Sequence, residues 1–305
     1  MQRNRVIVIV VVGIAVVSAI LSLYLADREE VRRIGTERVV VVRLNGPISE
    51  TSSGLAMMGA ITPERVRSTL ATIEGDSSID AVVLRIDSPG GSVAASQEIS
   101  SMIADFPLPV VVSMGDMAAS GGYYIAAAAD GIVAHPGTMT GSIGVILTTM
   151  NLQGLYENLG IDVEIIKSGR HKDMMQRALT SEERTLLQNL SDEAYGQFIE
   201  HIARHRDMGL EDVRAVATGE LFMGSQAYEL GLVDALGGEE EAIQLAGEIA
   251  GLQSPQRYEM PRTSPFQWMH WLAADARTFL INRLVPEEMR WIEMLQPYNY
   301  PRINY

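Results

Sequence analysis

From Val39 onward, short apolar runs alternate with segments of helical periodicity. The runs have the length of strands and are rich in valine and isoleucine, and glycine or proline follows most of them. The predicted strands are VVVVRL at residues 39–44, AVVLRID at 81–87, LPVVVSMG at 108–115, GIVAHP at 131–136, SIGVIL at 142–147 and VEIIKSG at 163–169. Because helical segments separate many of these strands, we expect an α/β fold of stacked β-α units rather than an all-β fold.

The predicted helices begin with capping sequences. Pro63 follows Thr62, which is the arrangement expected when proline takes the first helical position. Ser92 is expected to open a helix that runs to about Ala104. The stretch Thr180-Ser181-Glu182-Glu183 has the spacing of a capping box, and it predicts the start of a long amphipathic helix that reaches about His205.

The charge and the cysteine content exclude several functions. The formal net charge is −14, from 24 Lys and Arg against 38 Asp and Glu, so we expect no nucleic-acid partner. The chain contains no cysteine, which excludes structural disulfides, thiolate catalysis and cysteine-type zinc sites. The absence of cysteine does not determine the compartment.

The N-terminus predicts a membrane anchor. After MQRNR, residues 6–25 are uncharged and largely apolar, and twenty residues in a helix span about 30 Å, the thickness of a hydrocarbon core. A cleaved signal peptide has a shorter apolar region, so we expect the anchor, residues 1–25, to be retained. Residues 26–36 are rich in charged residues, which predicts a linker between the anchor and the folded domain. Arginines flank the span on both sides, so charge alone does not indicate its orientation.

The C-terminal part, residues 252–305, carries all three tryptophans, Trp268, Trp271 and Trp291. Its pattern predicts a helical extension. Such a helix could lie at a membrane interface or pack against protein, and packing is the more common outcome. The role of this extension is open at the level of sequence.

Three corners that contain glycine follow predicted strands and carry most of the chemistry. They are Asp87-Ser88-Pro89-Gly90-Gly91-Ser92, Ser120-Gly121-Gly122 and Thr140-Gly141-Ser142-Ile143-Gly144. Glycine at such a corner lets backbone N–H groups face a ligand, and two such amides can form an oxyanion hole. Phosphate binding is the competing use, but neither GxxxxGK[ST] nor GxGxxG is present. Ser120 is therefore a candidate both for a helix cap and for a nucleophile.

A serine nucleophile needs a base. His201 and His205 are four residues apart without a carboxylate in HExxH register, so we expect no metal site and no cofactor. His135 precedes a proline and is interpreted as structural. The stretch SGRHKD at residues 168–173 contains His171 and Lys172. A lysine acts as a base only when its surroundings lower its pKa well below the solution value.

The stretches IDSPGGS, MAASGGYYIA, TGSIGV and KSGRHKD, in this order and at these separations, resemble the signal peptide peptidase A (SppA) family. The resemblance covers residues 38–251, so we expect a peptidase domain at 37–251. It implies a crotonase-like (Clp protease-like) fold and a Ser–Lys dyad, with Ser120 as nucleophile and Lys172 as general base. It also implies that Ser142 orients the lysine and that the amides of Gly91 and Gly121 form the oxyanion hole. None of these five positions departs from the family pattern.

The resemblance further implies how the enzyme is assembled and where it acts. The chain has one such domain, which is typical of the short form, in which Ser and Lys meet across subunit boundaries in a homo-oligomeric ring, typically of eight. The family places the catalytic domain on the extracytoplasmic side of the cell membrane, anchored here by a single span at residues 6–25. Its substrates are apolar peptides such as signal-peptide remnants.

Several alternatives remain open from the sequence. A crotonase-type acyl-CoA enzyme would share the fold and the oxyanion hole but lacks the Ser–Lys pair and usually the anchor. A membrane-anchored, non-catalytic ring scaffold would keep the fold with a vestigial site. Within serine protease chemistry, His171 could replace Lys172 as the base. A related membrane Ser–Lys protease that acts on stomatin-like partners is the nearest alternative enzyme.

Overall fold

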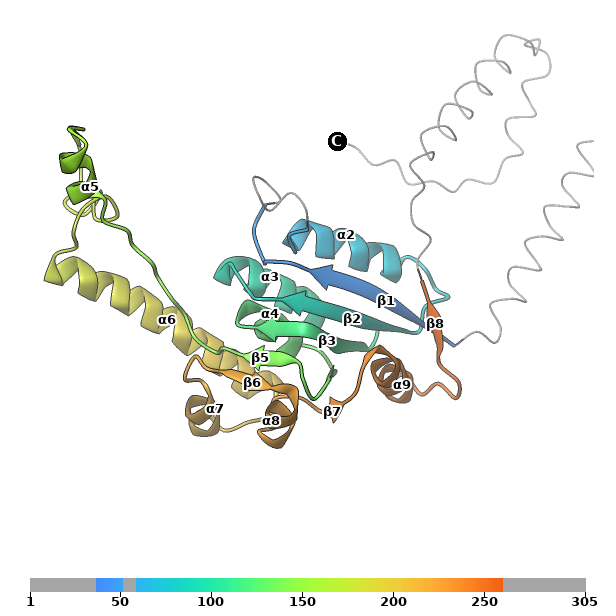
Figure 1. Ribbon diagram of the computed structural model, residues 1–305. Helices are drawn as coiled ribbons and strands as arrows, with labels where there is room; N and C mark the ends of the chain where they lie inside the picture. The colour runs from blue at the N-terminus through green and yellow to red at the C-terminus, as the bar shows by residue number, and fades with distance from the viewer. Residues whose placement is uncertain (1–36, 52–58, 260–305) are drawn as a thin grey trace, which may run out of the picture. The chain divides into compact units, whose positions relative to one another are not determined.

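The computed structural model describes residues 37–51 and 59–259, which belong to one compact unit ending at Glu259 (Figure 1). The strands are β1 (Arg38–Asn45), β2 (Ala81–Ser88), β3 (Val110–Ala119), β4 (Gly131–Ala134), β5 (Met139–Gly141), β6 (Leu221–Met223), β7 (Ala235–Leu236) and β8 (Gln256–Tyr258). The helices are α2 (Pro63–Glu74), α3 (Val93–Ala104), α4 (Gly121–Ala127), α5 (Gln153–Asn158), α6 (Ser181–His205), α7 (Leu210–Val216), α8 (Gly224–Glu229) and α9 (Glu239–Ile249). Strands and helices alternate, which confirms the predicted α/β class.

The strands form one predominantly parallel sheet in the order β6-β5-β3-β2-β1-β8, and only the β5–β6 pair is antiparallel. Strand β3 changes partners along its length: Val111–Ser113 pair with β4, and Met117–Ala119 pair with β5. The sheet therefore forks at the carboxyl end of β3, which is the place where Ser120 follows.

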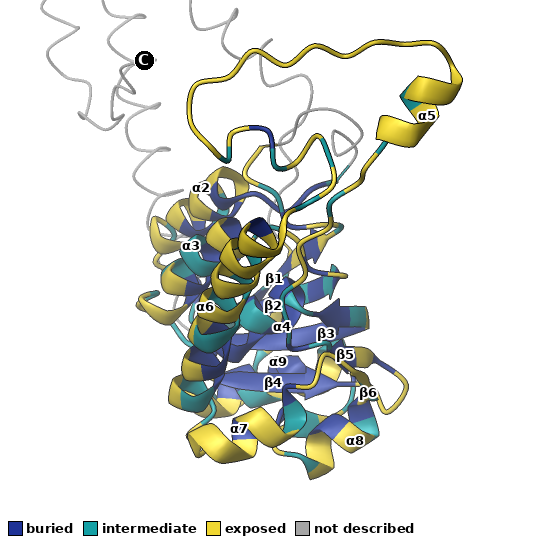
Figure 2. Cartoon of the chain, turned by 90° about the vertical axis from the view of Figure 1, so that its left-hand side faces the viewer, coloured by how far each residue is buried: buried dark blue, intermediate teal, exposed yellow. Residues whose placement is uncertain are grey.

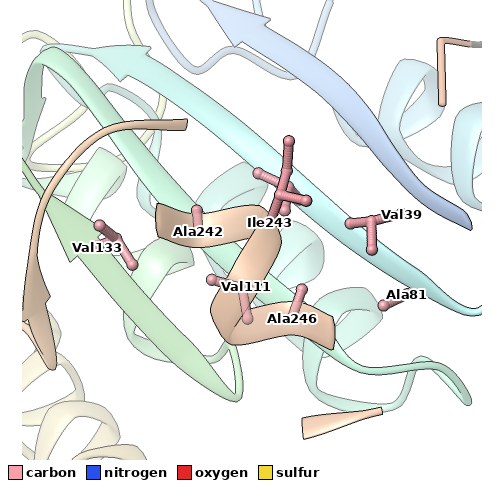
Figure 3. Packing of buried hydrophobic residues seen from close by; sticks show 8 residues of the cluster. Val39, Ala81, Val111, Val133, Ala242, Ile243 and Ala246 are labelled. Atoms are coloured by element: carbon pink, nitrogen blue, oxygen red, sulfur yellow. The ribbon is translucent and has the colours of Figure 1, made fainter. Parts of the chain in front are cut away.

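Helices cover both faces of the central strands. Alternate residues of β1 to β4 pack against α9 in a cluster that contains Val39, Ala81, Val83, Val111, Val133, Ala242, Ile243 and Ala246 (Figure 3). The residues between them, such as Val40, Val82 and Val112, are also fully buried. Figure 2 accordingly shows dark blue strands behind helices with exposed outer faces. Burial on both faces explains why β1, β2 and β3 contain continuous apolar runs.

Two predicted strands are wrong. Residues 142–147 and 163–169 form no strand, and β5 ends at Gly141. Figures 1 and 2 show that the segment between β5 and α6, which carries α5, extends away from the sheet and is mostly exposed. We call residues 145–180 the arm. Its apolar side chains include Ile146 and Ile166, which are 89% and 92% exposed. An apolar run becomes a strand only when a neighbouring strand pairs with it, and the described part of this chain offers the arm none.

The capping box of the long helix is confirmed. The Glu183 N–H donates to Thr180 Oγ1 over 3.2 Å, and the Thr180 N–H donates to Glu183 Oε2 over 2.9 Å. Helix α6 then continues to His205, as predicted.

The expected anchor and linker, residues 1–36, lie outside the described residues, as does the extension from residue 260 onward. Across residues 37–51 and 59–259, none of the helices combines the length and the apolarity needed to cross a bilayer. The sheet itself includes β8, which follows Gly251 and pairs with β1.

Candidate active site

Ser120 occupies the sharp corner between β3 and α4. Its backbone angles are φ 52° and ψ −121°, a conformation that is strained for a residue with a side chain and costs on the order of 1–3 kcal/mol. Backbone bonds hold it there, because the Ser120 N–H donates to the Gly141 oxygen over 2.8 Å and the Tyr124 N–H donates to the Ser120 oxygen over 2.9 Å. Strain that the surroundings maintain in this way is a feature of functional corners.

The prediction that Ser120 caps α4 through its side chain is wrong. Ser120 does stand at the N-cap position, but its hydroxyl makes no capping hydrogen bond. The positive φ turns the side chain away from the first amides of α4, and that turn leaves the hydroxyl available. Ser120 is only half-buried, so a ligand can reach it.

The two glycine corners beside Ser120 are in direct contact. A Cβ atom added to Gly90 would lie 2.7 Å from the Gly121 nitrogen and 2.9 Å from the Ser120 Cβ. A Cβ atom added to Gly121 would lie 2.5 Å from Ser96 Oγ and 3.3 Å from the Gly91 nitrogen. Only glycine therefore permits this approach. Gly90 and Gly91 have φ angles of 94° and 154°, which also favour glycine.

The amides of Gly91 and Gly121 have the properties that the sequence predicted for an oxyanion hole. They come from two different corners that touch one another beside Ser120. Neither N–H donates a hydrogen bond within residues 37–51 and 59–259. Unpaired donors next to a hydroxyl can bind the oxygen of a carbonyl that the hydroxyl attacks.

Ser142 lies close to Ser120 on the next corner. It follows β5, which pairs with the end of β3, and its φ of 48° is again positive for a residue with a side chain. Its N–H donates to the Glu220 oxygen over 2.7 Å. Ser120 and Ser142 line the same open pocket, together with residues of the Ile143–Ile146 segment and of α6. The fold therefore brings Ser142 to the predicted nucleophile.

An apolar pocket of about 110 Å³ adjoins Ser120, Gly91 and Gly121. Its apolar lining side chains are Val93, Tyr124, Val145, Ile146, Ala194 and Phe198. The sequence predicted this part of α6 only as an amphipathic helix, so the contribution of Ala194 and Phe198 to the pocket was missed. No local signal distinguishes a pocket wall from an ordinary packing face.

His201 packs behind this pocket, against Tyr124. Its ring stacks on the Tyr124 ring at 3.8 Å, and its Nε2 donates to the Tyr124 backbone oxygen over 2.9 Å. Burial lowers the pKa of His201 to about 4, with a further decrease from the nearby His205. Within the described ranges, no group of histidines and carboxylates is arranged to hold a metal ion.

Lys172 lies in the arm and not beside Ser120. Its side chain is exposed and lines neither pocket at Ser120, and its Nζ has no hydrogen-bond or ion-pair partner in the described part of the chain. Contacts to Glu183 hold its loop at the start of α6. Measured along α6 from Glu183, the open pocket at Ser120 begins at Gln188, about 8 Å away, and the apolar pocket begins at Ala194, about 16 Å away. A single subunit therefore keeps the predicted nucleophile and the predicted base apart.

The loop around Lys172 carries an ion-pair cluster that the sequence analysis missed. Arg177 binds both Asp173 and Glu183, and His171 Nδ1 lies 3.1 Å from Glu183 Oε1. The four-residue spacing of Asp173 and Arg177 was the signal that could have indicated part of it. In this cluster the side chain of His171, the alternative candidate base, contacts the carboxylate of Glu183.

The chain is similar to known proteases. Residues 105–253 match the sequence profile of Peptidase family S49. The chain is 45% identical over 213 residues to a Synechocystis protein that carries the name of a protease, slr0021, and the match covers 68% of this chain and 76% of that protein. It is 36% identical over 226 residues to the chloroplastic serine protease SPPA of Arabidopsis thaliana, and the match covers 72% of this chain and 33% of that protein.

Among solved structures, a mutant of the 1510-N membrane-bound stomatin-specific protease has a TM-score of 0.52 and 15% identity. The match covers 75% of this chain and 100% of that chain. A likeness at this identity shows a shared fold and nothing about the substrate.

Proposed function

Because the chain belongs to peptidase family S49, the family of the signal peptide peptidase A proteases, we propose that it is a serine endopeptidase with Ser120 as its nucleophile. One observation carries the proposal. The Ser120 hydroxyl makes no cap hydrogen bond and stands beside the two unpaired amides of Gly91 and Gly121. A nucleophile next to two donors is the minimum that acyl transfer requires.

The reaction begins when the Nζ of a neutral Lys172 accepts the proton of the Ser120 hydroxyl as its oxygen attacks a peptide carbonyl. The amides of Gly91 and Gly121 bind the negative oxygen of the tetrahedral intermediate, and each such donor contributes about 3 kcal/mol. The protonated lysine then gives its proton to the leaving amine as the C–N bond breaks. A water molecule, activated by the same lysine, hydrolyses the acyl-enzyme and restores Ser120.

We propose that Lys172 reaches Ser120 of a neighbouring subunit in a homo-oligomeric ring. Within one subunit Lys172 lines neither pocket at Ser120, and its loop is bound at the start of α6, before the α6 residues that line these pockets. The arm also exposes apolar side chains, including Ile146, Met150 and Ile166, that a monomer would leave in water. Ser142, which shares the pocket with Ser120, would then hydrogen-bond the incoming Nζ. A ring of eight is the assembly that the family resemblance implies.

The pocket beside Ser120 supports apolar peptide substrates. Its lining is apolar, and its volume of about 110 Å³ is suited to a medium-sized aliphatic side chain. We therefore propose that the enzyme degrades apolar peptides such as cleaved signal peptides. Residues 6–25 would anchor the ring in the cell membrane, with the peptidase domain on the extracytoplasmic side and its substrates near the bilayer.

Labelling with an alkyl fluorophosphonate tests the nucleophile and the base together. The full chain in detergent, Ser120→Ala and Lys172→Ala are compared, and mass spectrometry locates the adduct. Labelling at Ser120 that both substitutions abolish supports the proposal. If a well-folded full chain is not labelled, the non-catalytic scaffold is the better interpretation. If Lys172→Ala is still labelled while His171→Ala is not, the base is His171.

A further inference from the structure

Among the contacts that join the loop of Lys172 to α6, one arginine binds two carboxylates at once. Arg177 Nε and Nη2 lie 2.8 and 3.0 Å from the two carboxylate oxygens of Asp173. Arg177 Nη1 and Nη2 lie 2.9 and 2.7 Å from the two carboxylate oxygens of Glu183. We call Asp173, Arg177 and Glu183 the clamp.

The clamp is buried in a part of the chain that is otherwise exposed. Asp173 and Glu183 are 7% and 1% exposed, whereas Lys172, directly before Asp173, is open to solvent. Lys167 Nζ donates to Asp173 over 2.6 Å, and the N–H of Thr180 donates to Glu183. The hydrogen bonds from Arg177, followed by that from Lys167 at Asp173 and that from the Thr180 N–H at Glu183, keep the pKa of both carboxyls well below the usual range. Both carboxylates therefore stay ionised at neutral pH.

The clamp fixes the backbone on both sides of Lys172. Asp173 follows Lys172 directly and is bound by Arg177. His171 precedes Lys172 directly and contacts Glu183, the other carboxylate that Arg177 binds. Residues 167–177 contain no helix or strand, so no regular hydrogen-bond ladder holds this loop in place. The ion pairs and three short turns inside the loop therefore determine where Lys172 stands.

Stability alone is a poor explanation for such a cluster. A buried ion pair gains little net stability, because removing two charges from water costs about as much as their attraction returns. Its benefit is geometric, since a planar guanidinium that binds two carboxylates allows one arrangement only. In the arm, that arrangement determines the position of Lys172.

We propose that Arg177 is a positioning residue that holds Lys172 in the geometry for proton transfer. This inference rests on the proposed function, in which Lys172 is the general base. Without the Arg177 bridge, the loop detaches from the start of α6, and the lysine samples positions from which it cannot reach the serine. A misplacement of a reacting group by about 1 Å can cost on the order of 10²-fold in rate.

The decisive variant is Arg177→Lys in the full chain. It keeps the positive charge near Lys172, but an ammonium cannot bind both carboxylates through two pairs of parallel hydrogen bonds. Arg170→Lys is the matched control. It is the same substitution in the same loop, at an arginine that is 75% exposed and contacts only the half-exposed Glu182. Glu183→Gln, which weakens the other end of the bridge, serves as a second test.

The rate of acylation by an alkyl fluorophosphonate is measured as a function of probe concentration, which separates the maximal rate, kinact, from the half-saturating concentration, KI. We expect kinact of Arg177→Lys to fall on the order of 10²-fold with KI unchanged, because the Ser120 pocket is untouched. Glu183→Gln should lower kinact in the same way, and Arg170→Lys should behave as the unchanged chain.

Two results would overturn the proposal. One is a kinact of Arg177→Lys equal to that of the unchanged chain. The other is a loss of labelling that only follows the loss of folded protein, measured by circular dichroism, which would make the clamp structural. Lys172→Ala is measured in parallel. If that variant is labelled at the normal rate, the assignment of the base fails, which is a different failure from that of the clamp.

Discussion

Mixing two inactive variants within one assembly tests whether the nucleophile and the base come from different subunits. Ser120→Ala keeps Lys172, and Lys172→Ala keeps Ser120, so neither variant alone has a complete site. In the structure, the loop of Lys172 is bound at Glu183, about 16 Å along α6 from the pocket wall at Ala194. If neighbouring subunits complete the site, co-expression of the two variants must restore some activity.

The size of the recovery follows from how the sites are built. Each site takes its serine from one subunit and its lysine from the next, in a head-to-tail ring. With equal, randomly mixed subunits, the serine donor is intact at half of the sites and the lysine donor at half, so about a quarter of the sites are complete. This fraction does not depend on the number of subunits. A site within one subunit would give no recovery at all.

The assay measures the amount of Ser120 labelled by an alkyl fluorophosphonate, normalised to total protein and compared with the unchanged chain. Co-purification of the two variants through different affinity tags shows that they share an assembly, and a second mixture gives an independent value for shared sites. In this mixture the unchanged chain is co-expressed in equal amount with the Ser120→Ala, Lys172→Ala double variant. Relative to assemblies of unchanged chains only, about a quarter of the sites should be labelled if sites are shared, and about half if they are not. No recovery in the first mixture, although the two variants co-purify as one assembly, together with half in the second, would refute a shared site.

Other predictions concern the glycine corner, the stacked histidine and the pocket. Gly90→Ala should abolish labelling and lower the free energy of unfolding by about 1–3 kcal/mol in chemical denaturation, because its Cβ would lie 2.7 Å from the Gly121 nitrogen. Gly137→Ala is the control and should have little effect, because its Cβ would meet no atom within 4 Å. Burial lowers the pKa of His201 from 6.5 to about 4, so the ring is neutral in the folded chain and its protonation favours the unfolded chain. About 3 kcal/mol of folding stability should therefore be lost as the pH falls from 6.5 toward 4. His201→Gln should flatten this part of a plot of the thermal midpoint against pH, and an unchanged slope would contradict the explanation. Ala194→Leu should fill the pocket and slow labelling by a long-chain fluorophosphonate while a methyl fluorophosphonate still reacts; equal slowing of both would place the specificity elsewhere.

Much of the fold followed from local patterns. The apolar runs of β1, β2 and β3 are buried on both faces of the sheet, as continuous apolar runs in an α/β chain indicate. The capping box at Thr180 formed as predicted, because its two hydrogen bonds join residues only three apart in the chain. Predictions of this kind succeed because their interactions are short in sequence and do not depend on the rest of the fold.

The arm shows where local patterns fail. Residues 163–169 have the composition of a strand, but a strand exists only with a partner, and the described part of the chain provides none. Ser120 shows the same limit on a smaller scale. The sequence indicated a residue at the N-cap, yet the bonds from the Gly141 corner impose the positive φ that turns its hydroxyl away from the helix.

Local sequence patterns were enough to predict the α/β class, the corners at Gly91, Ser120 and Ser142, and the SppA motifs that identify the candidate residues. Only the tertiary structure brought the three corners together and left Lys172 apart from them. The contact of the Gly91 and Gly121 amides depends on how β2 and β3 lie side by side, and the separation of Lys172 depends on the length of α6 and on the clamp. Both are distances between residues remote in the chain, which are set by packing and not by local preference.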